Sequence, residues 1–179
     1  MRIVLSLLML VVLLAPEEAR AQQFLVHGAA GPIVNARGYS LAAGVGVTAG
    51  SRVTILGSFD RTHLPTTTTP LRNGVAYTRG GTLTLGSAEA QFSLFERSRV
   101  SPYALVGFGA GVSRPNVNDI FPNRVTNTVV APFAGGGVRI PLGEHVTLFG
   151  DIRWMLAAGT ESDELTGVVP LRAGLAFTF

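Results

Sequence analysis

The chain has 179 residues, no cysteine, no lysine and a formal net charge of +3. The absence of cysteine excludes a disulfide framework, a thiolate metal site and a cysteine nucleophile. The basic residues are scattered rather than clustered, so the charge does not favour a nucleic-acid partner. The 22 glycines are too many for a helical bundle and suit strands that twist and pack closely.

The first residues have the pattern of a secretory signal peptide. Arg2 is followed by the apolar run Ile3–Ala15 and then by the small-x-small tripeptide Ala19-Arg20-Ala21. A membrane-spanning helix needs about 20 apolar residues, so this run is short for an anchor. We therefore expect residues 1–21 to be a signal peptide and residues 22–179 to form one domain. An uncleaved signal anchor is the alternative.

After residue 23 the apolar side chains recur at every second position, which is the period of a β-strand. The pattern predicts eight strands, at about Phe24–Ala30, Tyr39–Thr48, Val53–Asp60, Leu83–Leu94, Ala104–Val112, Phe133–Ile140, Val146–Leu156 and Leu171–Phe179. In the fourth of these, Leu83 and Leu85 are out of step with Ala88 and Ala90. This shift predicts a bulge near Gly86-Ser87.

The connections between these strands alternate in length. Ala49–Ser51, Glu96–Ser101 and Pro141–His145 are short, whereas Thr62–Tyr77, Arg114–Thr126 and Ala157–Gly167 are longer and polar. The run Thr66–Thr69, between two prolines, is predicted to be a loop tip rather than a strand. Short turns on one side and long loops on the other are typical of outer-membrane barrels with periplasmic termini. Eight strands fit the length well, and ten stay an alternative.

The closing segment carries the most specific pattern. One face of the predicted last strand holds Leu171, Ala173, Leu175, Phe177 and Phe179, and the other holds Arg172, Gly174, Ala176 and Thr178. Aromatic residues also stand at the ends of the other apolar faces, as in the two interfacial girdles of membrane barrels. They are Phe24 at the end near Phe177 and Phe179, and Tyr39, Phe59 and Trp154 at the opposite end.

On this alternation, sidedness and terminal Phe, residues 23–179 resemble the small eight-stranded outer-membrane barrel family that includes OmpX and the transmembrane domain of OmpA. The resemblance implies an all-β, eight-stranded antiparallel up-and-down transmembrane β-barrel in the cell outer membrane. Its expected partners are outer-membrane lipid and the barrel-assembly machinery, which would read Phe177 and Phe179 as part of an assembly signal. We expect a monomer, with a role between structural support and adhesion.

The alternation also predicts which charged residues face the interior of the barrel. They are Asp60, Glu89, Arg139, Asp151, Arg153 and Arg172. An eight-stranded barrel has just enough interior space for side chains, and an unpaired charge there is costly. The predicted arrangement is a salt-bridge network, and a gated ion pathway is the alternative. His27 is expected to join the interior, and inward glycines are expected to make room for Phe133 and Phe149.

No catalytic or cofactor motif is present. His145-Val146-Thr147 is the nearest approach to the His-x-Ser pair of lipid A deacylases, but it has Thr in place of Ser and lies at a predicted periplasmic turn. His63 has no such pair, and the glycine runs 107–111 and 135–137 are not followed by Lys. The acidic run Glu161–Glu164 matches no calcium loop. We predict no enzymatic activity, no cofactor and no metal.

Three classes of function follow from these patterns. The first is a structural or surface-interaction barrel, the second is a small channel for ions or solutes, and the third is a soluble barrel that binds a lipid-like ligand. The third class predicts apolar side chains inside. In this chain the charged strand residues share a face with glycines and threonines, which favours insertion into a membrane.

Overall fold

The computed structural model describes residues 23–50, 52–70, 76–95, 99–115, 126–159 and 165–179. The expected signal peptide, residues 1–21, and the acidic run Glu161–Glu164 lie outside the described residues. Among the described residues, no helix is long and apolar enough to cross a membrane.

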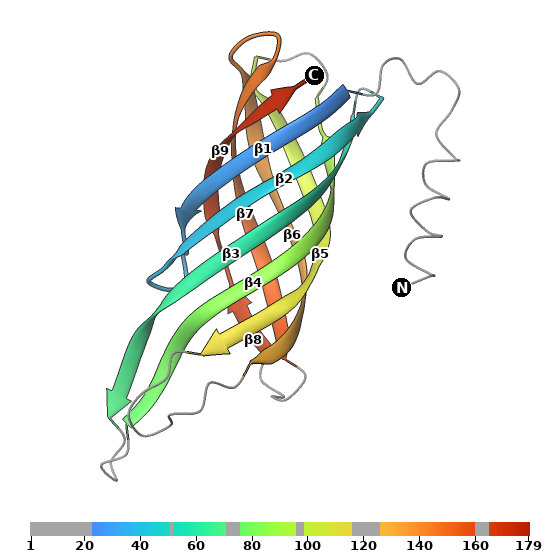
Figure 1. Ribbon diagram of the computed structural model, residues 1–179. Helices are drawn as coiled ribbons and strands as arrows, with labels where there is room; N and C mark the ends of the chain where they lie inside the picture. Colours follow the sequence, from blue (N-terminus) through green and yellow to red (C-terminus); the bar gives the residue numbers. More distant parts are fainter. Residues whose placement is uncertain (1–22, 51, 71–75, 96–98, 116–125, 160–164) are drawn as a thin grey trace, which may run out of the picture.

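The described residues form nine strand segments, all antiparallel to their neighbours (Figure 1). Their bounds are β1 Gln23–Pro32, β2 Tyr39–Ala49, β3 Val53–Pro70, β4 Ala76–Ser93, β5 Ser101–Pro115, β6 Asn127–Pro141, β7 Val146–Gly159, β8 Leu165–Val168 and β9 Leu171–Thr178. Each strand from β1 to β7 pairs with the next along the chain, and β7 pairs with both β8 and β9.

Pairing between β9 and β1 closes the sheet into a barrel. The register runs from Leu25 opposite Thr178 to Ala30 opposite Ala173, and the N–H of Phe179 donates to the carbonyl of Phe24 at 2.8 Å. β8 and β9 are two parts of one strand, separated at Pro170, which has no N–H to donate. The predicted eight-stranded up-and-down barrel is therefore confirmed, and Phe24 lies at the same end as Phe179, as expected.

The connection between β1 and β2 closes the seam around Pro170. The Asn35 side chain donates to the carbonyl of Gly167 at 2.7 Å and accepts from the N–H of Val169 at 2.9 Å. The N–H of Val34 donates to the Val169 carbonyl at 2.8 Å. These bonds occupy backbone groups that the broken strand leaves without a ladder partner, so the barrel stays closed there.

The predicted alternation of faces is confirmed along the strands. In β2, for example, Leu41 and Val45 are exposed on the outer surface, whereas Ser40 and Ala42 are buried inside.

The two ends of the barrel differ. We call the end with the β2–β3, β4–β5 and β6–β7 connections, Gln23 and Phe179 the turn end, and the opposite end the loop end (Figure 1).

The predicted bulge near Gly86-Ser87 is wrong. β4 pairs with both β3 and β5 without a register shift through these residues. Leu83 and Leu85 are out of step with Ala88 because they face the interior, where they are 8% and 1% exposed. Large aliphatic residues are expected to face outward in a membrane barrel, but part of this interior is apolar.

The prediction of a loop tip at Thr66–Thr69 is also wrong. β3 continues to Pro70 and pairs with β4 through Thr67–Arg79 to Pro70–Ala76. β2 begins opposite His63 and β5 ends opposite Gly81, so a two-stranded ribbon projects beyond the rest of the barrel (Figure 1). The irregularity in this ribbon lies between Leu64 and Thr67, opposite Gly80, whose φ of 132° is a conformation that glycine adopts readily.

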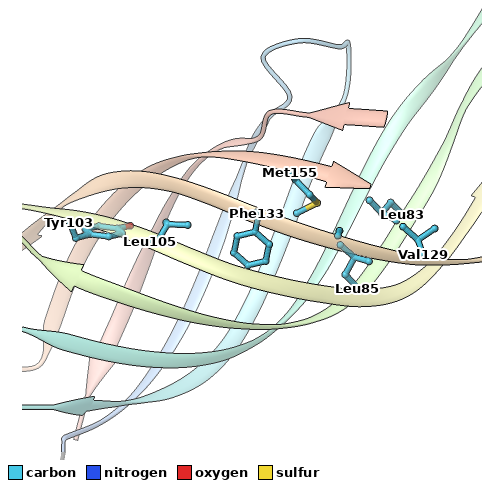
Figure 2. Packing of buried hydrophobic residues seen from close by; sticks show 8 residues of the cluster. Leu83, Leu85, Tyr103, Leu105, Val129, Phe133 and Met155 are labelled. Carbon is cyan, nitrogen blue, oxygen red and sulfur yellow. The ribbon is translucent and has the colours of Figure 1, made fainter. Parts of the chain in front are cut away.

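Apolar side chains fill much of the interior (Figure 2), mostly towards the loop end, whereas Tyr103 and Leu105 lie nearer the turn end. The buried cluster consists of Leu83, Leu85, Tyr103, Leu105, Val129, Ala131, Phe133 and Met155. Phe133 occupies space that a side chain at Gly107 would need, because a Cβ there would overlap the Phe133 ring. A Cβ at Gly174 would likewise meet the Phe149 ring at 2.7 Å. The expectation that inward glycines make room for these two phenylalanines is confirmed.

The contact between Gly107 and Phe133 predicts that Gly107→Ala destabilises the barrel. Overpacking a close-packed interior costs about 1–3 kcal/mol, and urea unfolding in lipid vesicles measures it. Gly57→Ala is the matched control, because Gly57 is also in a strand but a Cβ there meets nothing within 4 Å. Equal unfolding midpoints for the two variants would show that Gly107 is not needed for packing.

Candidate functional site: the charged interior of the barrel

All six residues expected in the interior lie on inward-facing strand positions. Asp60, Glu89, Asp151, Arg153 and Arg172 are buried, with 1% to 4% of their surface exposed, and Arg139 is half-buried towards the turn end. β3, β4, β7 and β9 supply the five buried residues, and β6 supplies Arg139. Segments far apart in the sequence therefore bring their charges together in one closed space.

Arg153 is at the centre of this interior. Its guanidinium group donates to both carboxylate oxygens of Glu89, one of them at 3.1 Å, and to Asp151 at 2.8 and 3.2 Å. The guanidinium carbon also lies 5.3 Å from the centre of the Phe133 ring. The planar fork of arginine donors suits two carboxylates at once, which lysine could not match.

Arg172 links a second acid to the same group. It donates to Asp60 at 2.7 Å and to the two oxygens of Asp151 at 3.2 and 3.4 Å. Asp60 also accepts from the Ser87 hydroxyl at 2.6 Å, and the Tyr103 hydroxyl lies 3.3 Å from Asp151. Asp151 is thus shared by two arginines, and each buried acid has a cationic partner.

Arg139 takes part in a different way. Its guanidinium donates to the amide oxygen of Gln91 and to the Ser93 hydroxyl at 3.4 Å, and it lies 4.6 Å from the centre of the Tyr103 ring. The amide nitrogen of Gln91 in turn donates to Glu89 at 2.5 Å. Gln91, which the sequence argument did not single out, is therefore the link between Arg139 and the central charges.

His27 lies in the interior and contacts a residue that sequence reasoning missed. Its Nε2 is 3.0 Å from the Ser58 hydroxyl, and its ring is edge-on to Phe149. The β1–β2 and β2–β3 registers place His27, Gly44 and Ser58 in one row. A Cβ at Gly44 would collide with both side chains, so this glycine allows the contact. The contact between His27 and Ser58 could be predicted only from the β1–β2 and β2–β3 registers, which place the two residues in one row.

A small cavity opens beside His27 at the turn end. Its volume is about 100 Å³, and Thr48, Thr54, Thr147, Gln91 and Arg139 are among the residues that line it. Further along the barrel lie the salt-bridge network and then the apolar side chains of Leu83, Leu85, Val129, Ala131 and Met155, whereas Tyr103 and Leu105 lie on the turn-end side of the network. The described residues thus form three successive layers: a shallow polar cavity, a charged layer and an apolar layer.

The other candidate residues do not converge on a reaction centre. His145 lies at the turn end and contacts the backbone carbonyl of Thr178 at 3.1 Å, and His63 packs against the ring of Tyr39. Within the described ranges, no three His, Asp or Glu side chains are grouped so that they could hold a metal ion. The interior geometry supports packing and charge neutralisation.

Comparison with known proteins identifies the fold. No family model and no curated protein matches the sequence. The N-terminal β-barrel domain of OprF from Pseudomonas aeruginosa matches 88% of this chain and 97% of its own length, with a TM-score of 0.63 and 13% identity. This is the fold of the small outer-membrane β-barrels. Neisserial surface protein A matches 88% of this chain and 96% of its own, with a TM-score of 0.63 and 15% identity.

A third similar structure is Ail, the attachment invasion locus protein of Yersinia pestis. It matches 89% of this chain and 100% of its own length, with a TM-score of 0.53 and 15% identity. At sequence identities of 13% to 15% these similarities establish the fold alone.

The ion-pair geometry predicts different costs for two arginine substitutions. Arg153→Leu leaves Glu89 and Asp151 short of a partner, and breaking a buried pair costs about 3–5 kcal/mol. Arg139→Leu removes bonds to the neutral Gln91 and Ser93, for which we expect about 1–3 kcal/mol. Urea unfolding followed by the fluorescence of Trp154, the single tryptophan, measures both. Equal costs would contradict a central role for Arg153.

Proposed function

We propose that this chain is a monomeric outer-membrane barrel with a structural or surface-interaction role and no enzymatic activity. The observation that carries the proposal is the combination of an apolar outer surface, a filled interior and a ribbon that projects at the loop end. The outer surface and the interior argue against the competing functions, and the ribbon supports the surface-interaction role.

The outer surface supports insertion into a membrane. Large apolar side chains are exposed around the barrel, among them Val106 at 52%, Ile152 at 47% and Leu171 at 46%. Aromatic residues are exposed as well, including Phe59 at 58% and Trp154 at 66%. A soluble protein rarely exposes so continuous an apolar surface, whereas an apolar outer band with aromatic residues is typical of membrane barrels.

The interior argues against the soluble lipid-binding alternative. A ligand pocket typically has about 300–1,000 Å³ and mostly apolar walls. Here the cavity beside His27 has about 100 Å³ and its walls include Arg139 and several threonines. A lipid chain would have to displace the charged layer, which would leave buried charges without partners.

The same interior argues against the channel alternative. The ion pairs of Arg153 and Arg172 are followed by closely packed apolar side chains such as Leu85 and Phe133. A permeant ion would have to break the salt bridges and then cross the apolar layer without ligands.

The β3–β4 ribbon supports a surface-interaction role. Beyond His63 and before Gly81 the two strands pair only with each other among the described residues, so their outer edges carry no strand partner. Unpaired strand edges can accept hydrogen bonds from another chain. The name of the similar protein Ail refers to attachment and invasion, and its fold gives this role a precedent.

We further propose that Phe177 and Phe179 form part of a signal for the barrel-assembly machinery. Both side chains face outward, with 44% and 75% of their surface exposed, on the strand that closes the barrel against β1. The resemblance to small outer-membrane barrels supplies the assembly role. Residues 1–21 are proposed to direct secretion to the periplasm, where this machinery acts.

The surface-interaction role predicts that the ribbon is needed for attachment. Residues 65–80 can be replaced by a two-residue Asn-Gly turn, which suits a β-hairpin. We expect bacteria that carry this variant to adhere to cultured epithelial cells as poorly as bacteria without the protein. Heat-modifiable migration on a gel controls for barrel folding. Unchanged adherence with a folded barrel would contradict the role.

The assembly signal predicts that Phe179→Ala lowers the amount of barrel in the outer membrane. Fractionation and immunoblotting should then find the missing protein in the periplasm. Phe95→Ala is the matched control, because Phe95 is 63% exposed at the turn end but lies outside β9. A similar loss in both variants would indicate general destabilisation, and no loss in either would remove the assembly role.

A further inference from the structure

The outward-facing charges of the strand side chains that the structure describes are confined to one area. Among strand residues whose side chains the structure describes, Arg61 of β3 and Arg114 of β5 are the charged residues that face outward. Both are exposed, and neither forms an ion pair with an acidic side chain of the described residues. The remaining charged strand residues in this set face the interior, where they neutralise one another.

These two arginines flank β4 at the loop end. Arg61 is opposite Thr84, and Arg114 is opposite Thr82, so both threonines lie between the arginines on the outer face. β3, β4 and β5 are adjacent strands (Figure 1). With strands about 4.8 Å apart and a rise of about 3.3 Å per residue, the two arginine Cα atoms are about 12 Å apart. Two long side chains can converge across this distance on one group above the threonines.

The position along the strands places this area at the edge of the apolar band. On β5 the outward residues from Ala104 to Val112 are apolar or small, and Arg114 follows at about one membrane crossing from Ala104. On β3, Arg61 comes directly after Asp60 and two positions after the exposed Phe59. Arginine is costly at the bilayer midplane but costs little near the interface, where its side chain can extend to the headgroups.

The arginine and threonine side chains of this area suit an anion with several oxygen atoms. Arginine forms paired hydrogen bonds with phosphate, and threonine hydroxyls can donate to the same oxygens. The outer leaflet of an outer membrane consists largely of a phosphorylated glycolipid, whose phosphates lie at this depth. We propose that Arg61, Arg114, Thr82 and Thr84 form a binding site for a phosphate group of this lipid. The proposal rests on the proposed outer-membrane location.

Binding of lipid A to the folded full-length barrel in micelles, measured by native mass spectrometry, tests the site. Each basic residue near an anionic surface contributes about fivefold, so Arg61→Gln with Arg114→Gln should weaken binding of diphosphoryl lipid A about 25-fold. Arg99→Gln, at an exposed residue of the turn end, should bind like the wild type. A phosphate-free lipid A analogue should bind the wild type and the double variant equally.

Three outcomes would overturn the site. The first is equal affinity of the wild type and the double variant for diphosphoryl lipid A. The second is complete displacement of the lipid by inorganic phosphate at an equal concentration, which would indicate a site for a free anion. The third is a wild-type barrel that binds phosphorylated and phosphate-free lipid A equally well, a result that depends on no variant. Heat-modifiable migration after reconstitution into vesicles tests membrane insertion separately. Failure of the proposed outer-membrane location can therefore be distinguished from failure of the phosphate site.

Discussion

The hydrogen-bonding requirement of the backbone determines the rest of this structure. Inside a bilayer, strand N–H and C=O groups have no water to bond, so a sheet is stable there only if it closes on itself. Pairing of β9 with β1 provides the closure, and the Asn35 side chain maintains it where Pro170 interrupts the last strand. Closure with eight strands then fixes a narrow barrel whose interior must be filled by its own side chains.

The filled interior explains both the charges and the glycines. Buried acids are tolerated because Arg153 and Arg172 lie within hydrogen-bond distance of Glu89, Asp151 and Asp60. The large side chains that complete the packing fit because glycines stand opposite them, as Gly107 does opposite Phe133. The described side chains that occupy the interior in this way argue against a path for solutes. The proposed functions therefore depend on the outer surface and the projecting ribbon.

Sequence periodicity was sufficient to predict the fold, because every strand of a membrane barrel alternates between a residue that faces out and one that faces in. It was insufficient where the type of a residue differs from the type expected on its face. Leu83 and Leu85 suggested a bulge because apolar residues were expected outside. The Thr66–Thr69 run suggested a loop because prolines flank it, and proline rarely stands inside a strand. Contacts across the barrel, such as His27 with Ser58 and Arg139 with Gln91, depend on register. Register is set by pairing between distant segments, which local patterns do not contain.

The central claim is that the apolar face meets lipid, and Trp154 reports on it directly. It is the single tryptophan of the chain, and 66% of its surface is exposed on the outer face of β7. In vesicles the account predicts blue-shifted Trp154 emission that brominated phospholipids quench strongly and aqueous acrylamide quenches weakly. Red-shifted emission that acrylamide quenches and brominated lipids leave unchanged would show that this face meets water, and would contradict the account.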